Sequence, residues 1–276
     1  MPELPEVETI ARALSPVLTG RRIVRALVLD PSVLPNAGAA GAAAFRALTE
    51  GRVITAVRRR AKLCLIDLSG GAIVAVHLKM TGRLSVADAL DPPPARARLI
   101  FALEGGGGLV FSDLRRFGSC RAFAPGAIEG WEFYRTLGPE PLAIGAFEFI
   151  PLFAKTSRAI KAALLDQRVI AGIGNIYADE ALFRAGIRPE AKANAISPER
   201  LAVLHAAVQA VLTEAVEAGG STIRDYRTPE GIEGAFQHHF KVYGRAGQKC
   251  PACGKKLVAA KIAARTSTYC PGCQKK

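Results

Sequence analysis

The segment Cys250-Pro-Ala-Cys253 and the segment Cys270-Pro-Gly-Cys273 are two Cys-x2-Cys pairs that residues 254–269 separate. Each pair presents two thiolates from a tight turn, and two such pairs complete a tetrahedral zinc site that leaves no position for a catalytic water. A redox dithiol is the alternative, but the matched spacing on both sides favours zinc. We therefore predict one structural Zn²⁺ that supplies much of the folding free energy of a small finger.

The finger lies in a strongly basic part of the chain. Nine of the 36 residues from Lys241 to Lys276 are lysine or arginine, and none is acidic. The whole chain has a net charge of +13, so about two thirds of this charge (9 of 13) belongs to that segment. A field of this sign attracts polyanions. We expect a nucleic acid as the partner; no basic amphipathic helix points to a membrane.

The composition is that of a folded protein. The chain has 276 residues, of which 50% are hydrophobic and 22% charged, enough for one large domain or two ordinary ones. No apolar run approaches the roughly 20 residues of a membrane helix, and the N-terminus lacks the layout of a secretory signal. We expect a cytosolic protein without a membrane partner, in which the isolated Cys64 and Cys120 are buried free thiols.

Hydrophobic periodicity predicts an α+β protein. A helix is expected over 4–18, and the following residues to 124 are rich in short strands joined by turns, which is typical of a sandwich or barrel. Residues 36–44 and 91–94 are expected to be surface loops. From residue 148 the pattern is helical, and Ser197-Pro198 marks the start of the longest helix. The expected strands are 22–29, 52–59, 62–68, 73–79, 96–103, 109–112 and 119–123, and the expected helices are 148–154, 158–166, 175–185 and 198–218.

Pro2 and Glu3 admit two interpretations. Proline and glutamate at a helix start are ordinary capping residues. If Met1 is removed, however, Pro2 carries a secondary amine at the chain end, and a terminal amine has a pKa of about 8, well below that of lysine. Its attack on a sugar C1′ gives a cationic iminium that acidifies the C2′ proton. Glu3, one residue on, is placed to donate and accept protons.

Three segments together resemble formamidopyrimidine-DNA glycosylases. They are Met-Pro-Glu-Leu-Pro-Glu-Val-Glu-Thr at 1–9, Gly-Ile-Gly-Asn-Ile-Tyr-Ala-Asp-Glu at 172–180 and Ala-Arg-Thr-Ser-Thr-Tyr-Cys-Pro-Gly-Cys-Gln at 264–274. The resemblance implies a bacterial repair enzyme that excises oxidised purines and then cuts the strand by β,δ-elimination. It also implies an N-terminal helix with an antiparallel β-sandwich, and a helix–two-turn–helix domain with a four-Cys zinc finger. The expected divisions are 1–135 (catalytic), 136–147 (hinge), 148–240 (helical) and 241–276 (finger).

The resemblance also assigns roles to residues. Pro2 becomes the Schiff-base nucleophile and Glu3 the general acid/base, with Glu6 a further acidic position. Without the family, Lys62 is a solvated strand-end lysine, His77 a core histidine and Arg265 one more cation of the tail. The resemblance implies that these three residues contact DNA phosphates, and that Lys62 and Arg265 belong to the catalytic residues. It also implies that Lys155 takes part in 8-oxoguanine processing. Residues from Ser221 to about 240 correspond to a loop that covers the lesion.

Two further groups of residues are expected to contact DNA. Gly172-Ile173-Gly174 is a weak nucleotide motif with no strand before it, so we expect no nucleotide cofactor, and Asn175 with the helix N-terminus is expected at a DNA phosphate. A duplex base must be flipped out before it can react. Met80, Arg115 and Phe117 match the residues that fill the gap, although most Met and Phe side chains are simply core. Thr81 stands at a position that varies in the family.

Two other classes remain open on the sequence. An endonuclease VIII-like enzyme shares the nucleophile and the finger but prefers oxidised pyrimidines; Leu4 and the Arg-Arg-Phe segment at 115–117 favour the purine enzyme. The second open class is a zinc-ribbon protein that binds DNA without catalysis. The expected partner is damaged double-stranded DNA, bound by a monomer.

Overall fold

The computed structural model describes residues 1–35 and 38–276, which form two compact units. Unit 1 comprises Met1–Arg135 and Gly219–Ala235, and unit 2 comprises Thr136–Ala218 and Phe236–Lys276. The first boundary coincides with the expected end of the N-terminal domain. The second does not, because residues 219–235 pack with unit 1 rather than with the helical domain to which the sequence assigned them.

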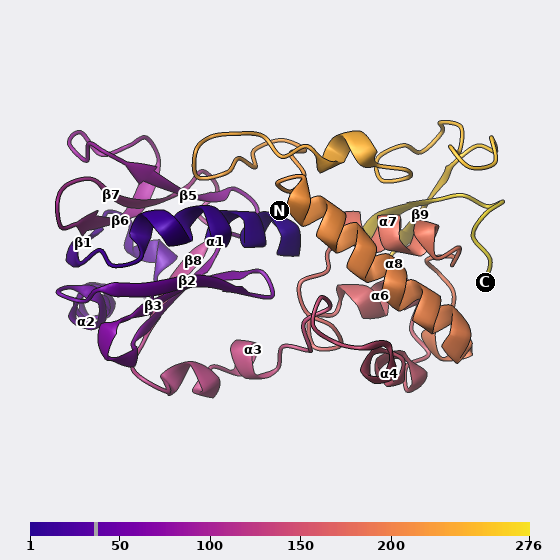
Figure 1. Ribbon diagram of the computed structural model, residues 1–276, viewed down its shortest axis with the longest axis horizontal. Coiled ribbons are helices and arrows are strands. Elements are labelled where there is room, and N and C mark those ends of the chain that lie inside the picture. Colours follow the sequence, from indigo (N-terminus) through magenta and orange to yellow (C-terminus); the bar gives the residue numbers. More distant parts are fainter. Residues whose placement is uncertain (36–37) are drawn as a thin grey trace. The chain divides into compact units, whose positions relative to one another are not determined.

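Unit 1 contains two four-stranded antiparallel sheets (Figure 1). One has the order β1-β6-β7-β5 and the other β2-β3-β4-β8. Their inward-facing apolar side chains form one core, as in a sandwich. The strands are β1 (Ile23–Val28), β2 (Ile54–Arg60), β3 (Leu63–Leu68), β4 (Ile73–His77), β5 (Gly82–Ala87), β6 (Ala97–Leu103), β7 (Gly108–Asp113) and β8 (Ser119–Phe123).

Helix α1 (Leu4–Leu18) joins this core with a single apolar face. Val7, Ile10, Leu14 and Leu18 recur at helical spacing and are all but inaccessible to solvent. The helix runs alongside the sandwich (Figure 1). The burial of this face fixes the start of the helix, and with it Pro2 and Glu3, against the rest of unit 1.

Two sequence expectations in unit 1 are wrong. The segment expected to be a loop at 36–44 is largely α2 (Ala39–Thr49), with residues 36–37 outside the described part of the chain. Alanine has the highest helix propensity, and Phe45 and Thr49 anchor the helix by burial. Strand β5 was not expected, because its pairing with β7 decides its conformation more than its own alternation does. Cys64 and Cys120 are buried free thiols, as predicted, and burial raises the pKa of Cys64 to about 12.

Unit 2 is built on helices and ends in a β-hairpin. Pro151 divides the expected 148–154 helix into two short ones, since proline cannot continue the hydrogen-bond ladder. The Ser197 side chain caps the long helix through the Arg200 N–H. The helices are α4 (Ala146–Phe149), α5 (Pro151–Ala154), α6 (Ile160–Leu165), α7 (Asn175–Arg184) and α8 (Pro198–Glu217), and the hairpin strands are β9 (Val258–Ile262) and β10 (Arg265–Tyr269). Helix α3 (Glu132–Arg135) belongs to unit 1 and ends its first segment.

Among the described residues, no helix has both the length and the apolar character to cross a membrane.

Candidate active site and nucleic-acid interface

The N-terminus of unit 1 is held by Glu6. Its Oε2 accepts a hydrogen bond of 2.7 Å from the Glu3 N–H, and its Oε1 accepts one of 2.7 Å from the Ser221 N–H. The Tyr226 hydroxyl, which donates to the Gly219 carbonyl, also reaches the Glu6 carbonyl at 3.4 Å. One buried carboxylate therefore connects the start of α1 to the segment 219–235, and this contact explains why that segment belongs to unit 1.

Pro2 and Glu3 are both buried at this point, and Glu3 is only 4% exposed. Glu3 is the N-cap of α1 and has an extended backbone, so its side chain lies beside the positive end of the helix. Met1 precedes them and is 48% exposed. Removal of Met1 would thus leave the Pro2 amine at the chain end, one residue before the buried Glu3.

Lys62 and His77 lie at one end of the β2-β3-β4-β8 sheet. Leu63 pairs with His77, so Lys62 lies at the same end of the sheet as His77. The side chains of Lys62 and His77 are both buried. Burial, then the charges of Lys79 and Lys62, lower the pKa of His77 to about 3. The Nδ1 atom of His77 accepts a hydrogen bond from the Lys79 N–H at 3.1 Å, which leaves the proton of the neutral ring on Nε2. His77 is therefore a neutral donor.

The three expected gap-filling side chains are brought together. Met80 follows β4, and Arg115 and Phe117 lie in the loop between β7 and β8. The Arg115 guanidinium contacts the Met80 sulfur at 3.4 Å and lies 4.6 Å from the centre of the Phe117 ring. Met80 is 44% and Phe117 53% exposed, so neither is a core residue.

In unit 2, Asn175 and β10 meet. The Asn175 Nδ2 donates to the Thr266 carbonyl at 3.1 Å, and its Oδ1 has no hydrogen-bond partner among the described residues. Arg265 precedes Thr266 and is exposed at the end of the β9–β10 hairpin. The N-terminus of α7, the Asn175 amide and the Arg265 side chain thus lie on adjoining elements.

A lysine that the sequence analysis missed lies beside them. Lys161 on α6 is fully buried, and its Nζ donates to Asp179 Oδ1 at 2.6 Å, to Ser267 Oγ at 2.6 Å and to the Thr266 carbonyl at 3.3 Å. By contrast, the predicted Lys155 is exposed at the end of α5, and no hydrogen bond or ion pair in the described chain connects it to Asn175 or Arg265. A lysine within the apolar run Ile160–Leu165 was the available signal.

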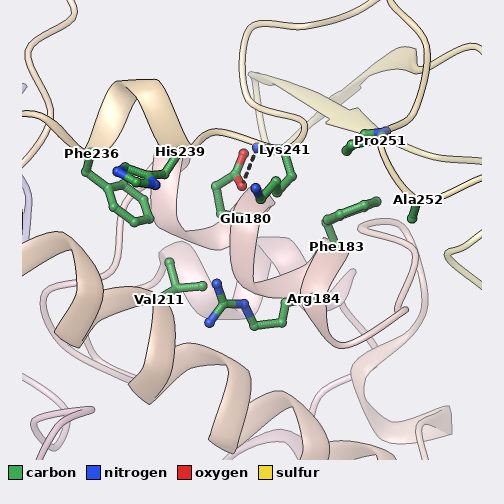
Figure 2. A pocket seen from close by; sticks show the side chains of 9 residues that line it. All are labelled: Glu180, Phe183, Arg184, Val211, Phe236, His239, Lys241, Pro251 and Ala252. Atoms are coloured by element: carbon green, nitrogen blue, oxygen red, sulfur yellow. Dashed lines mark hydrogen bonds between the residues drawn. The ribbon is translucent and has the colours of Figure 1, made fainter.

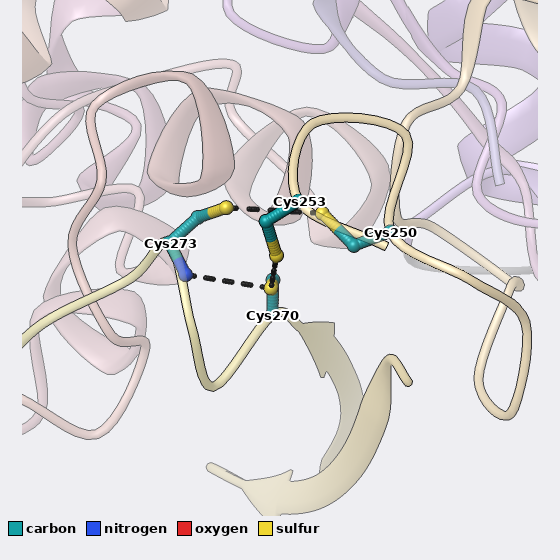
Figure 3. A group of neighbouring side chains, drawn as sticks. All are labelled: Cys250, Cys253, Cys270 and Cys273. Carbon is teal, nitrogen blue, oxygen red and sulfur yellow. Dashed lines mark hydrogen bonds between the residues drawn. The ribbon is translucent and has the colours of Figure 1, made fainter. Parts of the chain in front are cut away.

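The four finger cysteines converge (Figure 3). Their Sγ atoms all lie within 4.8 Å of one another, with Cys250 and Cys273 at 3.8 Å and Cys253 and Cys270 at 3.4 Å. Sulfurs that are about 2.3 Å from a central zinc stand about 3.8 Å apart. Glycine at position 272 lets the second pair approach the first, since a Cβ there would lie 3.2 Å from the Cys253 sulfur. The four side chains fit a structural zinc ion.

Two consecutive acidic residues of α7 hold the finger. The Asp179 Oδ2 accepts from the Thr268 N–H at 3.0 Å, while Glu180 accepts from three successive backbone N–H groups before the first cysteine pair. Those groups belong to Lys241, Val242 and Tyr243, at 2.9, 3.0 and 2.7 Å. Burial raises the pKa of Asp179 to about 6, against the effect of Lys161.

A hollow of about 330 Å³ lies between α7, α8 and the first cysteine pair (Figure 2). Apolar side chains such as Phe183, Val211 and Phe236 line it. Glu180 and Lys241 also line it, and the Lys241 N–H donates to the Glu180 carboxylate there. None of the predicted site residues lines this hollow, so the hollow is not the candidate active site.

Three family models match the chain in succession. They are the formamidopyrimidine-DNA glycosylase N-terminal domain at 1–120, the H2TH domain of the same enzymes at 137–227, and the zinc finger found in FPG and IleRS at 247–276. The formamidopyrimidine-DNA glycosylase of Moorella thermoacetica is 45% identical, with 93% of each chain covered.

The chain belongs to the formamidopyrimidine-DNA glycosylase family. The crystal structure of the MutM (Fpg) protein from Thermus thermophilus is 42% identical and matches with a TM-score of 0.88 over 99% of this chain and 98% of that one. A Lactococcus lactis Fpg mutant bound to Fapy-dG-containing DNA matches with a TM-score of 0.91 at 30% identity, with both chains fully covered. The chain is thus a DNA glycosylase of base excision repair, and the expected α+β fold with a helical domain and four-Cys finger is confirmed.

Proposed function

We propose that this glycosylase removes oxidised purines, such as 8-oxoguanine and formamidopyrimidines, and then cleaves the strand as an abasic-site lyase. The observation that carries the proposal is the arrangement of Pro2 and Glu3, which Glu6 holds at the buried start of α1. Relatives of known structure support the substrate class, since their complexes contain Fapy-dG, carbocyclic 8-oxo-G or an abasic site.

The chemistry follows from the Pro2 amine. After removal of Met1, its nitrogen attacks the sugar C1′ while the damaged base leaves, and ring opening with proton transfer through Glu3 gives an iminium. The iminium withdraws electrons from C2′, whose proton is lost as the 3′ phosphate leaves in β-elimination. A second elimination expels the 5′ phosphate, and water then hydrolyses the iminium to release Pro2.

The remaining residues are proposed to hold DNA. Lys62 and the neutral Nε2–H of His77 would contact phosphates from unit 1, and Asn175 and Arg265 would do so from unit 2. Met80, Arg115 and Phe117 would fill the gap that the everted base leaves. The exposed Lys155 would take part in 8-oxoguanine processing, as the family resemblance implies, whereas the buried Lys161 would keep Thr266 in place beside Asn175.

One structural zinc ion on Cys250, Cys253, Cys270 and Cys273 would keep the β9–β10 hairpin, and hence Arg265, in place. It takes no part in the bond changes.

Borohydride trapping tests the proposal. The purified protein is incubated with duplexes that carry 8-oxoguanine, thymine glycol or an undamaged pair, and the cross-linked peptide is identified by mass spectrometry. We expect an adduct on Pro2 with the 8-oxoguanine duplex. Preferential trapping on thymine glycol would indicate an endonuclease VIII-like enzyme, and DNA binding without any adduct would indicate a non-catalytic zinc-ribbon protein.

A Pro2→Gly variant supplies the control for the chemistry, because its terminal amine is primary and lacks the ring. Retention of Met1, for example by a bulky residue at position 2, turns the nitrogen of residue 2 into an amide and moves the terminal amine to Met1. Binding of damaged duplex with loss of strand cleavage in both proteins supports Pro2 as the nucleophile, whereas full cleavage by the protein that retains Met1 would contradict it.

A further inference from the structure

The side chains proposed to fill the DNA gap come from two separate turns of unit 1. Met80 lies between β4 and β5, and Arg115 and Phe117 lie between β7 and β8. Leu114, which the sequence analysis did not single out, is a further apolar side chain of the second turn and is 51% exposed. Insertion into DNA costs conformational entropy of the side chains and of their backbone, and a backbone that is already ordered reduces the second cost.

The carboxylate of Asp113 joins the two turns. Its Oδ1 accepts from the Thr81 hydroxyl at 2.5 Å and from the Arg115 N–H at 3.2 Å, and its Oδ2 accepts from the Gly118 N–H at 2.7 Å. The Arg115 N–H also reaches the Thr81 Oγ1 at 3.1 Å. Asp113 is 1% exposed, so its carboxylate has little access to water, and its bond to the Gly118 N–H is buried.

The turn is fixed from its other side as well. Arg116 has a left-handed backbone with a φ of 59° and forms an ion pair with Asp30 at 3.3 Å. Arg98 pairs with the same carboxylate at 3.4 Å and donates to the Asp113 carbonyl at 2.9 Å. Gly118 admits no side chain, since a Cβ there would lie 2.7 Å from the Phe111 ring and 3.0 Å from Asp113 Oδ2.

We propose that Thr81 and Asp113 are positioning residues that clamp the Met80 turn to the 114–117 turn, so that the gap-filling side chains enter DNA as one ordered unit. This inference rests on the proposed function of Met80, Arg115 and Phe117. It also gives Thr81 a role different from contact with the lesion, because its hydroxyl is engaged by Asp113 and by the Arg115 N–H.

Thr81→Val is the main test, since valine has nearly the shape of threonine but lacks the hydroxyl. The probe is a duplex with a tetrahydrofuran abasic analogue and 2-aminopurine next to the orphaned base, whose fluorescence rises as neighbours are unstacked. The analogue cannot react with Pro2, so the signal reports insertion and not chemistry. Loss of the hydrogen bond from the Thr81 hydroxyl to Asp113 should slow the fluorescence rise about three- to ten-fold.

Thr81→Ser is the conservative control because it keeps the hydroxyl, and its insertion rate should return to within about two-fold of the wild type. A double-mutant cycle with Phe117→Ala tests whether Thr81 acts through the inserted side chains. A smaller effect of Thr81→Val in that background supports the clamp. Equal rates for wild type and Thr81→Val would overturn it, as would the same loss in Thr81→Ser or full additivity with Phe117→Ala.

Thermal unfolding of each variant shows whether it is folded, and borohydride trapping on a natural abasic site reads the Pro2 chemistry separately. If the wild type inserts normally but forms no adduct, the proposed chemistry fails and the clamp stands. If the wild type gives no fluorescence change, the clamp is wrong.

Discussion

At the scale of single residues, the environment decides the chemical state of a side chain. His77 shows this, because its position at a strand end in the sequence is compatible with either a charged or a neutral ring. Its burial between Lys62 and Lys79 lowers its pKa to about 3, and the bond from the Lys79 N–H selects the tautomer. A neutral ring can still donate to a phosphate oxygen, and it does so without a proton taken from solvent.

The low pKa of His77 predicts a pH-dependent stability. In the unfolded chain the ring has a pKa of about 6.5, so between that value and 3 the unfolded state binds a proton that the folded state does not. Stability therefore falls as the pH falls, by about 2 kcal/mol between pH 7.5 and 5. Urea unfolding at the two pH values measures this difference in stability, and His77→Gln should not lose the about 2 kcal/mol that the histidine accounts for. The exposed His238→Gln should behave as wild type, and an unchanged slope in His77→Gln would contradict the assignment.

Substitutions of the two candidate lysines should differ in their effect on the free energy of unfolding. Lys161→Met leaves the buried Asp179 carboxylate without its ion pair and removes a bond to the Thr266 carbonyl, so it should cost about 3–5 kcal/mol of unfolding free energy. Lys155→Met changes an exposed side chain and should lie within about 0.5 kcal/mol of wild type. Urea unfolding measures both. Excision of 8-oxoguanine, assayed at a temperature where both variants are folded, shows which lysine the reaction needs.

At the scale of elements, α7 connects the helical part of unit 2 to the finger. Its N-terminus presents Asn175, its middle holds β10 through Asp179, and the next residue, Glu180, caps the segment before Cys250. A finger with only a small core of its own depends on such bonds and on its metal for orientation. The helix thereby sets where Arg265 lies relative to Asn175.

Glu180→Gln tests this connection. The amide keeps the shape but replaces one acceptor oxygen by a donor that faces backbone N–H groups, so we expect a loss of about 2–3 kcal/mol. Release of zinc to a colorimetric chelator should be faster in this variant than in wild type. The exposed Glu217→Gln on α8 is the matched control. Wild-type zinc release by Glu180→Gln would mean that the carboxylate does not hold the finger.

At the scale of the whole molecule, we expect charge to govern the affinity for DNA. The net charge of +13 is concentrated in the last 36 residues, whereas the proposed chemistry lies at the N-terminus. Phosphate contacts supply affinity without sequence information. Affinity for any duplex should therefore depend on the finger, and the choice of damaged DNA should depend on unit 1.

Removal of zinc separates these two contributions. The chelated protein should bind damaged and undamaged duplexes more weakly by a similar factor, because the proposed contacts of the finger are with backbone phosphates, which both duplexes have. The slope of log affinity against log salt should fall by about 0.9 for each phosphate that the finger no longer neutralises. Fluorescence anisotropy over a series of salt concentrations measures both effects. An unchanged slope after chelation would show that the finger binds no phosphate.

The sequence alone determined the features that depend on neighbours along the chain. Cysteine spacing predicts the metal site, periodicity predicts α1 with its observed bounds, and the motif at 1–9 points to Pro2 and Glu3. The tertiary structure decided what depends on residues far apart. Glu6 meets Ser221 across 215 positions, Lys161 meets Ser267 across 106, and β5 exists through its pairing with β7. Local patterns carry no information about such partners, because the fold of the intervening chain brings them together.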